Sequence, residues 1–112
     1  MKKIECLIRS EKLKDLTLAL KKARIGGMTV SEVRGFGMQN DRPDNFLFVH
    51  KTKIEIYAVD SQVKPVISTI LMHCSTGKAG DGKIAVLPLD DCVRVSTGER
   101  KNKAILLERK GR

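Results

Sequence analysis

Three glycines and two lysines lie close together within residues 77–83, a spacing that is typical of an anion-binding loop. Glycine reaches backbone conformations that a Cβ forbids, so successive N–H groups can line a concave surface. Lys78 and Lys83 add positive charge on either side of that surface. The stretch therefore predicts a cradle for a phosphate or a similar anion.

Gly77 to Lys83 also matches G-x-x-x-x-G-K, the core of the phosphate-binding P-loop. A P-loop follows a strand, opens a helix and carries Ser or Thr after its lysine. Here Ile84 follows the lysine, a helical pattern precedes the loop and a strand-like run follows it. We therefore expect an anion-binding loop on a different fold.

The other residue types that support chemistry are scattered. Cys6, Cys74 and Cys92 are odd in number and have no C-x-x-C spacing, so we interpret them as reduced thiols. His50 and His73 have no companions at metal-ligand spacing, and we assign no metal site. No Ser-His-Asp set, Cys-His set or pair of carboxylates at a plausible spacing indicates an enzyme.

Composition sets limits on the class of protein. Residues 1–112 are enough for one domain, and 41% hydrophobic with 31% charged residues is typical of a globular chain. The longest apolar runs fall short of the ~20 residues of a membrane span. Glu5 and Arg9 interrupt the apolar start that a signal peptide needs, which favours the cytoplasm.

The net charge of +9 favours anionic partners without naming one. Six of the 22 basic residues lie in residues 100–112, where we expect a solvated basic tail. A nucleic-acid-binding module is the alternative, and an aromatic content of only 4% argues against base stacking.

Hydrophobic periodicity predicts an α+β domain. Alternation is typical of strands, and apolar residues at i, i+3, i+4 and i+7 from Val63 to Cys74 indicate a helix. Ser10 is expected to cap the first helix, Gly26-Gly27 to end it, and Asp60 or Ser61 to cap the second. We expect strands at 3–8, 28–33, 52–58 and 83–87, the last resuming at 92–95, with helices at 11–24 and from 60 onward.

This order is βαββαβ, the ferredoxin-like arrangement of one antiparallel sheet with two helices on one face. In the third strand, Ile54, Ile56 and Ala58 should face the helices while Tyr57 faces away. The second face of the sheet would remain uncovered in a monomer, so we expect the chain to form an oligomer.

Five blocks of the chain resemble the PII signal-transduction proteins, in the order and near the spacing of that family. The blocks are residues 1–4, 27–37, 51–56, 76–84 and 93–99. The resemblance implies a homotrimer of ferredoxin-like subunits with nucleotide sites in the three clefts between subunits, and no catalysis. Such proteins bind ATP or ADP, often with 2-oxoglutarate and magnesium, and use a long loop to dock on transporters, enzymes or regulators.

The resemblance also implies roles for individual residues. Adenine would lie on Thr29 and on the backbone at Tyr57. Gln39 and Lys51 match positions that help to hold 2-oxoglutarate. The positions assigned to the nucleotide's phosphates and their surroundings are Gly35, Gly37, Gly80, Asp81, Gly82, Lys83, Arg94 and Ser96.

Residues 38–50 correspond to the docking loop, which is shorter here than in the family and contains no Tyr for uridylylation. We expect it to be flexible. Phe46 and Phe48 belong to an apolar run that either extends the third strand, the reading we favour, or docks on the partner. Met38 and Ser96 stand where the family usually has arginines, so ADP or AMP should bind at least as tightly as ATP, and 2-oxoglutarate weakly.

These observations predict a regulator, without enzymatic activity, that binds adenine nucleotides and controls a target enzyme or transporter in nitrogen metabolism. The alternative is a PII-like regulator of carbon metabolism or transport that responds to bicarbonate. A nucleic-acid-binding ferredoxin-like module is a more distant alternative. No cofactor is obligatory in any of these readings, because the nucleotide is a regulatory ligand.

Overall fold

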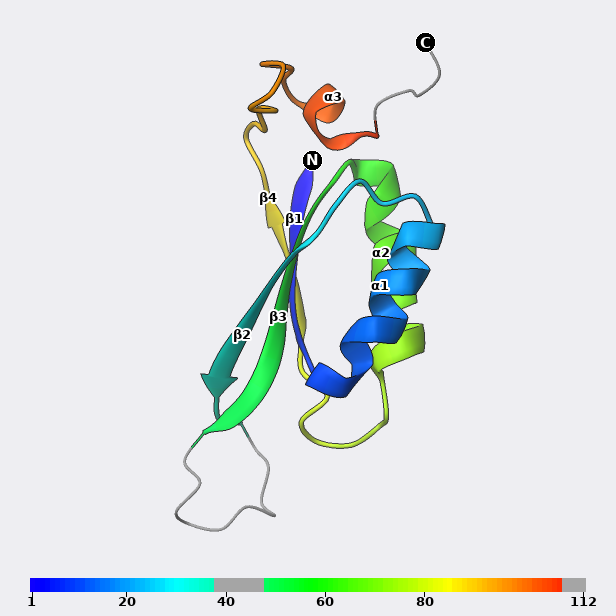
Figure 1. Cartoon of the computed structure of the whole chain (residues 1–112), viewed down its shortest axis with the longest axis vertical. Helices are drawn as coiled ribbons and strands as arrows, with labels where there is room; N and C mark the ends of the chain where they lie inside the picture. The colour runs from blue at the N-terminus through cyan, green and yellow to red at the C-terminus, as the bar shows by residue number, and fades with distance from the viewer. Residues whose placement is uncertain (38–47, 108–112) are drawn as a thin grey trace.

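A four-stranded sheet carries two helices on one face in the computed structural model, which describes residues 1–37 and 48–107 (Figure 1). The strand order is β2-β3-β1-β4 and each neighbouring pair is antiparallel. The predicted βαββαβ ferredoxin-like fold is therefore confirmed. The elements are β1 (Lys2–Ile8), η1 (Ser10–Lys12), α1 (Leu13–Lys22), β2 (Thr29–Gly35), β3 (Val49–Ala58), α2 (Asp60–Cys74), β4 (Ile84–Pro88) and α3 (Asn102–Ile105).

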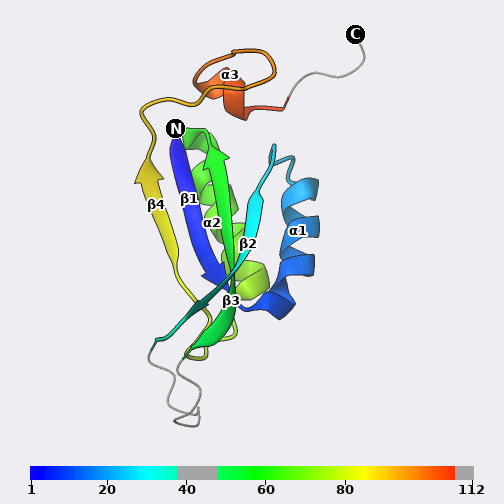
Figure 2. The ribbon, with the colours of Figure 1, turned by 60° about the vertical axis from the view of Figure 1, so that its left-hand side comes forward.

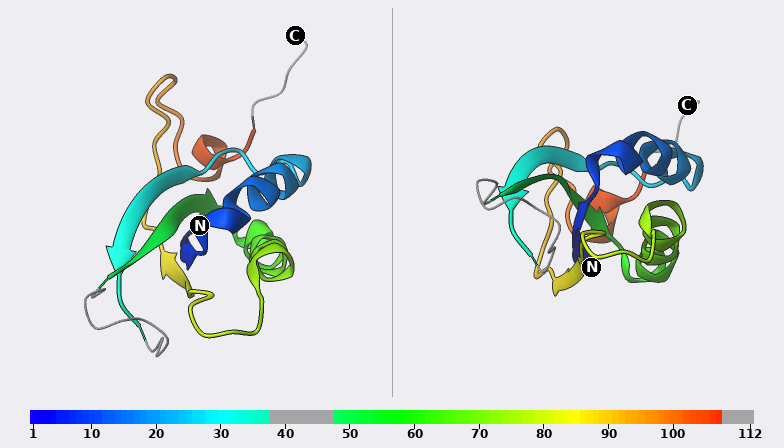
Figure 3. Two further views of the ribbon diagram at one scale, coloured as in Figure 1. Left: turned by 60° about the horizontal axis from the view of Figure 1, so that its bottom comes forward. Right: turned by 90° about the horizontal axis from the view of Figure 1, so that it is seen from below.

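The core lies between the sheet and the helices α1 and α2, which form a second layer (Figure 3). Alternate residues of β1 and β3 point into this layer, as the period of a strand requires. A fully buried aliphatic side chain contributes ~1.5–3 kcal/mol, so this layer supplies most of the stability. Its buried members are Ile4, Cys6, Ile8, Leu16, Leu20, Ile54, Ile56, Ala58, Val66, Ile70 and Cys74.

The opposite face of the sheet is partly exposed and carries charged side chains together with apolar ones such as Leu7 and Leu87. Tyr57 points to this side and is 53% exposed, as predicted. Lys3 Nζ lies 2.6 Å from Glu55 Oε2 and 3.5 Å from Glu5 Oε1, and Lys53 Nζ is 3.9 Å from the same Glu5 oxygen. Because these charges pair across strands, they stabilise a surface that neither α1 nor α2 covers.

The starts of the helices differ from the caps that we predicted. Ser10 makes no cap bond, and its hydroxyl instead accepts a hydrogen bond from the buried Thr52 hydroxyl at 2.9 Å. The N-cap of α2 is Val59, whose N–H donates to the Gln62 side chain at 3.0 Å. Asp60 is thus the first helical residue, where its charge favours the helix dipole.

The end of α1 is set by Arg24 rather than by Gly26-Gly27. Arg24 has a φ of 62°, in the left-handed region, and its N–H donates to the Lys21 carbonyl at 3.0 Å. The next N–H, that of Ile25, donates to the Leu20 carbonyl at 3.1 Å. These two bonds make a Schellman motif, which any residue that tolerates the left-handed conformation can close.

The predicted return to a strand at 92–95 is wrong. Val93 pairs only with Arg100, as an isolated bridge, and Arg94 N–H donates to the Glu99 carbonyl at 2.8 Å. The segment is a short hairpin beyond the end of β4, and Val95 is fully exposed. Residues 92–95 alternate as a strand would, but they find no sheet partner among the described residues and therefore do not form a strand.

The start of the predicted basic tail is folded. The Lys101 N–H donates to the Cys92 carbonyl at 2.8 Å, and Ile105 in α3 is only 9% exposed. The backbone of Ile105 packs so closely on Gly26 that a Cβ there would lie 2.8 Å from the Ile105 oxygen. Residues 108–112 of the tail lie outside the described residues.

Most of the predicted docking loop also lies outside the described residues, including Met38, Gln39 and Phe46. β3 begins at Val49, so Val49 and His50 belong to the strand and not to the loop. Phe48 precedes the strand, is 51% exposed, and has its ring centroid 6.2 Å from that of Phe36. The predicted strand extension therefore reaches only Val49, is wrong at Phe48, and lies outside the described residues at Phe46.

Candidate functional site

The glycine loop after α2 closes around one of its own carboxylates. The backbone N–H groups of Thr76 and Gly77 donate to Asp81 Oδ2 at 2.7 and 2.9 Å, and the Thr76 hydroxyl donates to Oδ1. These bonds, with those from Thr76 strongest, hold the pKa of Asp81 well below its usual range. The carboxylate of Asp81, a residue predicted to contact a nucleotide, thus occupies the first part of the anion cradle in this structure.

Arg9 holds the same carboxylate from a distant part of the chain. Its Nε lies 3.0 Å from Asp81 Oδ1, and one terminal nitrogen donates to the Ala79 carbonyl at 2.8 Å. Arg9 directly follows β1, while Asp81 lies 72 residues later. Sequence reasoning missed this contact because no local pattern connects two residues so far apart.

Gly82 brings the loop into direct contact with the end of β1. Its φ is +103°, and a Cβ at this position would lie 1.6 Å from the Leu7 carbonyl oxygen. The Leu7 N–H donates to the Lys83 carbonyl at 3.0 Å. Gly77 and Gly80 also have positive φ, at 81° and 98°, so the predicted need for glycine at all three positions is confirmed.

Several donors of the loop remain available for a ligand. In the described part of the chain, no hydrogen-bond acceptor pairs with the backbone N–H groups of Ala79, Gly80, Gly82 and Lys83. The side chain of Lys83 is exposed beside them. Unpaired backbone N–H groups close to an ammonium group are the chemistry that an anion requires.

Lys51 connects this loop to β3. Its Nζ donates to the Gly80 carbonyl, and its Cα pairs with Val33 across the β2–β3 ladder. Gly35, at the end of β2, pairs with Val49 two rungs further along. The glycine loop, the start of β3 with Lys51 and the end of β2 with Gly35 therefore lie toward one end of the molecule (Figure 1), and Gly37 is two residues beyond the end of β2.

The remaining predicted positions lie toward the opposite end. Thr29 begins β2 and Tyr57 is near the end of β3. Arg94 and Ser96 lie in the hairpin beyond β4, next to α3 and far from the glycine loop in two views (Figures 1 and 2). One chain therefore brings together the predicted phosphate loop with Lys51, but not with Thr29, Tyr57, Arg94 or Ser96.

Arg94 has partners of its own at that end. One terminal nitrogen donates to the carbonyls of Lys103 and Leu106 at 2.8 and 2.7 Å, and the other lies 3.3 Å from Glu99 Oε1. These bonds fasten α3 and the residue after it to the hairpin. In this chain Arg94 thus organises the C-terminal segment.

Comparison with known proteins identifies the family. A sequence model described as "Nitrogen regulatory protein P-II" matches residues 1–99. The chain belongs to the P-II family. It is 43% identical to a protein of that name from Microchaete diplosiphon and 44% identical to one from Synechocystis sp., in each case over 94% of this chain and all of the relative. A third, "Nitrogen regulatory protein P-II 2" from Methanothermobacter thermautotrophicus, is 42% identical over 94% of this chain and 97% of its own length.

Family membership confirms the predicted resemblance and the class of protein. P-II proteins are signalling regulators rather than enzymes.

Within residues 1–37 and 48–107, no three His, Cys, Asp or Glu side chains come together as metal ligands. Nor does any helix of these residues have the length and apolar character to cross a membrane.

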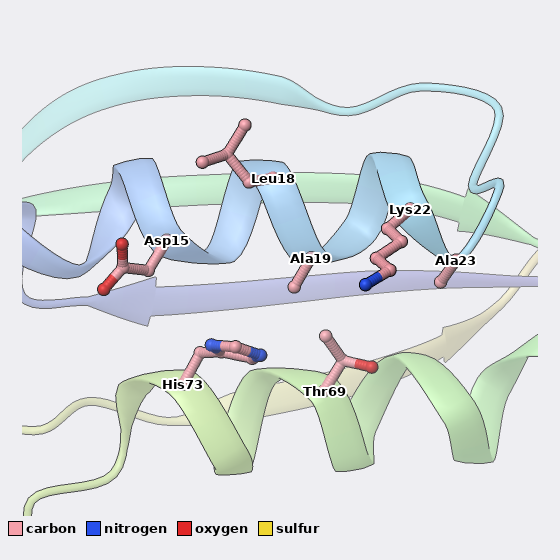
Figure 4. Close-up of a pocket in the computed structure, with 7 residues that line it drawn as sticks. All are labelled: Asp15, Leu18, Ala19, Lys22, Ala23, Thr69 and His73. Atoms are coloured by element: carbon pink, nitrogen blue, oxygen red, sulfur yellow. The ribbon is translucent and has the colours of Figure 1, made fainter.

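The described residues of this P-II chain also form a groove between the helices and a hollow that borders the glycine loop at Gly82 and Lys83. A groove of about 600 Å³ lies between α1 and α2, where Asp15 and Lys22 face His73 and Thr69 (Figure 4). A smaller hollow of about 340 Å³ lies behind the glycine loop, and its lining includes Ile70, Leu71, Cys74, Ile84 and Lys83. The groove shares no residue with the predicted nucleotide site.

Proposed function

We propose that this P-II family member binds an adenine nucleotide and passes its state to a target protein in nitrogen metabolism. Its family makes it a nitrogen-signalling regulator, and the nucleotide and the target are the new part of the proposal. The observation that carries the proposal is the glycine loop, held in shape by Asp81 and Arg9, with backbone N–H groups that have no partner among the described residues and with Lys83 beside them. Nucleotide phosphates are anions of the kind that such N–H groups bind.

The separation of the predicted residues supports a site between subunits. Lys51 contacts the loop, and Tyr57 lies six residues further along β3, about 20 Å away at ~3.3 Å per residue. A nucleotide that placed its phosphates on the loop would not reach Tyr57 of the same chain. A second copy would supply Thr29 and Tyr57, and closed packing of three copies would place one such cleft at each interface.

The available cations favour the shorter nucleotides. Lys83 is beside the loop, but Ser96 is a neutral residue and Arg94 already pairs with Glu99. The additional charge of ATP would meet few partners, and an unpaired charge is expensive to bury. We expect ADP or AMP to bind at least as tightly as ATP, with 2-oxoglutarate adding little.

The proposal is tested by calorimetric titration of ATP, ADP and AMP with and without Mg²⁺, and by light scattering. Lys83→Ala should weaken nucleotide binding by ~1.5–3 kcal/mol, the value of a charge-assisted hydrogen bond. Lys14→Ala removes an exposed lysine of α1 and serves as the control. Unchanged affinity in a folded Lys83→Ala protein would remove the loop from the site, and a monomer would rule out the cleft.

Mixed oligomers test the cleft directly. Thr29→Trp should block the predicted adenine position, since Thr29 is exposed at the start of β2, while Lys83→Ala weakens the loop of the other subunit. In a cyclic trimer that contains both variants, one of the three clefts has two native halves. A random equal mixture should therefore regain native affinity in about a quarter of its clefts. No recovery after subunit exchange would place the whole site within one chain.

A further inference from the structure

The geometry points to Arg9 as the positioning residue of the glycine loop, acting through the carboxylate of Asp81. The inference deepens the proposed function, on which it rests for the identity of the ligand. It assigns Arg9 and Asp81 to the shape of the loop and not to contact with the phosphates. We call the contact between these two side chains and the loop backbone the Arg9–Asp81 clasp.

Arg9 is itself held firmly. Its backbone is extended, with φ −64° and ψ 134°, directly between the buried Ile8 of β1 and the helical turn η1. The Lys12 N–H donates to the Arg9 carbonyl at 3.0 Å and fixes the far side. A guanidinium anchored in this way serves as a fixed point against which a loop of glycines can be ordered.

The clasp joins two separate points of the loop. Nε of Arg9 reaches Asp81, and a terminal nitrogen reaches the Ala79 carbonyl, so one planar group sets the spacing between them. Asp81 in turn accepts hydrogen bonds from the N–H groups of Thr76 and Gly77. A lysine has a single charged atom and does not reproduce the fork of an arginine.

Charge gives Arg9 a second effect, which an experiment must separate from the first. Asp81 would repel a nearby phosphate, and the guanidinium 3.0 Å from its Oδ1 compensates that charge. If Arg9 acted only as a cation, Asp81→Asn would strengthen nucleotide binding, and a double variant would bind like the native protein. If the clasp positions the loop, Arg9→Gln and Asp81→Asn should each weaken binding, and the double variant should be about as weak as either alone.

Two measurements on the full chain decide between these possibilities. Amide hydrogen exchange of Thr76 and Gly77 in the ligand-free protein reports the shape of the loop, because both N–H groups donate to Asp81. Titration with ADP reports the site. We expect Arg9→Gln to speed exchange of these two amides by ~10-fold or more, and to weaken ADP binding by ~10-fold or more. Arg9→Lys should recover only part of each loss.

The control is Lys14→Gln, which removes one positive charge from the exposed surface of α1 and should change neither quantity. Unchanged exchange in Arg9→Gln would overturn the clasp, whatever the protein binds. Faster exchange with unchanged ADP affinity would overturn the positioning role, as would an Asp81→Asn protein that binds ADP more tightly. A native protein that binds no nucleotide would refute the proposed function, while exchange in the variants would still decide whether the clasp orders the loop.

Discussion

Replacing Gly82 with alanine should disrupt the contact between the glycine loop and strand β1. An added Cβ would lie 1.6 Å from the Leu7 oxygen and 2.6 Å from the Leu7 carbonyl carbon. Both are backbone atoms of β1, so no side-chain rotation relieves the overlap. The Cβ-to-oxygen separation would have to grow from 1.6 Å to at least 3.0 Å, which moves the loop away from the strand.

The expected cost has two parts. A non-glycine residue with positive φ costs about 1–2 kcal/mol, and the φ of Gly82 is +103°. Moving the loop would also break the 3.0 Å bond from the Leu7 N–H to the Lys83 carbonyl, worth about 0.5–1.5 kcal/mol. Gly82→Ala should therefore destabilise the fold by about 2–3 kcal/mol, with loss of anion binding at the loop.

Gly77→Ala is the matched control. Its φ of +81° imposes a comparable backbone cost, but no atom lies within 4 Å of the added Cβ. Denaturant unfolding at one protein concentration should show Gly82→Ala less stable than Gly77→Ala by about 0.5–1.5 kcal/mol, the value of the lost hydrogen bond. Equal stabilities would show that the close approach to Leu7 does not matter, and would refute the argument.

Two further predictions concern the ends of elements. Arg24→Gly should stabilise the protein by up to about 1 kcal/mol in denaturant unfolding, because glycine takes the left-handed conformation at no steric cost; a clear loss of stability would contradict this account of the end of α1. The Arg100 guanidinium, and then the Cys92 N–H, lower the pKa of Asp91 to about 2. A lowered carboxyl pKa stabilises the fold above its unfolded value of about 3.9, and the contribution is lost as the pH falls through about 2. A carboxyl titration followed by NMR should show this pKa rise toward about 3.9 in Arg100→Gln, and an ordinary pKa in the native protein would contradict the pair.

The fold could be predicted because its determinants are local. Ile54, Ile56 and Ala58 alternate along one strand, and the helical spacing from Val63 to Cys74 repeats over about three turns. Each pattern specifies which side of an element is buried before any partner is known. Few topologies are compatible with this order of elements, so the sheet and the layer of two helices could be predicted from it.

The features that could not be predicted depend on contacts between residues distant in the sequence, or on which of several suitable residues ends an element. The contact of Arg9 with Asp81 needs the fold to bring its two ends together. Arg24 takes the left-handed position although Gly26 is two residues away, because the helix ends where its Schellman bonds close. Val95 lies in a β-like pattern, yet a strand also needs a neighbour, which sequence alternation does not supply.

The antiparallel topology explains why the predicted site is divided. Successive elements, with the helices counted among them, run in opposite directions, so the connections between them alternate between the two ends of the sheet. The turn after β1 with Arg9, the end of β2, the start of β3 and the glycine loop before β4 all fall at one end. The start of β2, the end of β3 and the hairpin after β4 fall at the other, and these carry Thr29, Tyr57 and Arg94. Changes of side chain leave this division in place, because it follows from the path of the chain. A nucleotide that needs both groups of residues therefore needs two chains.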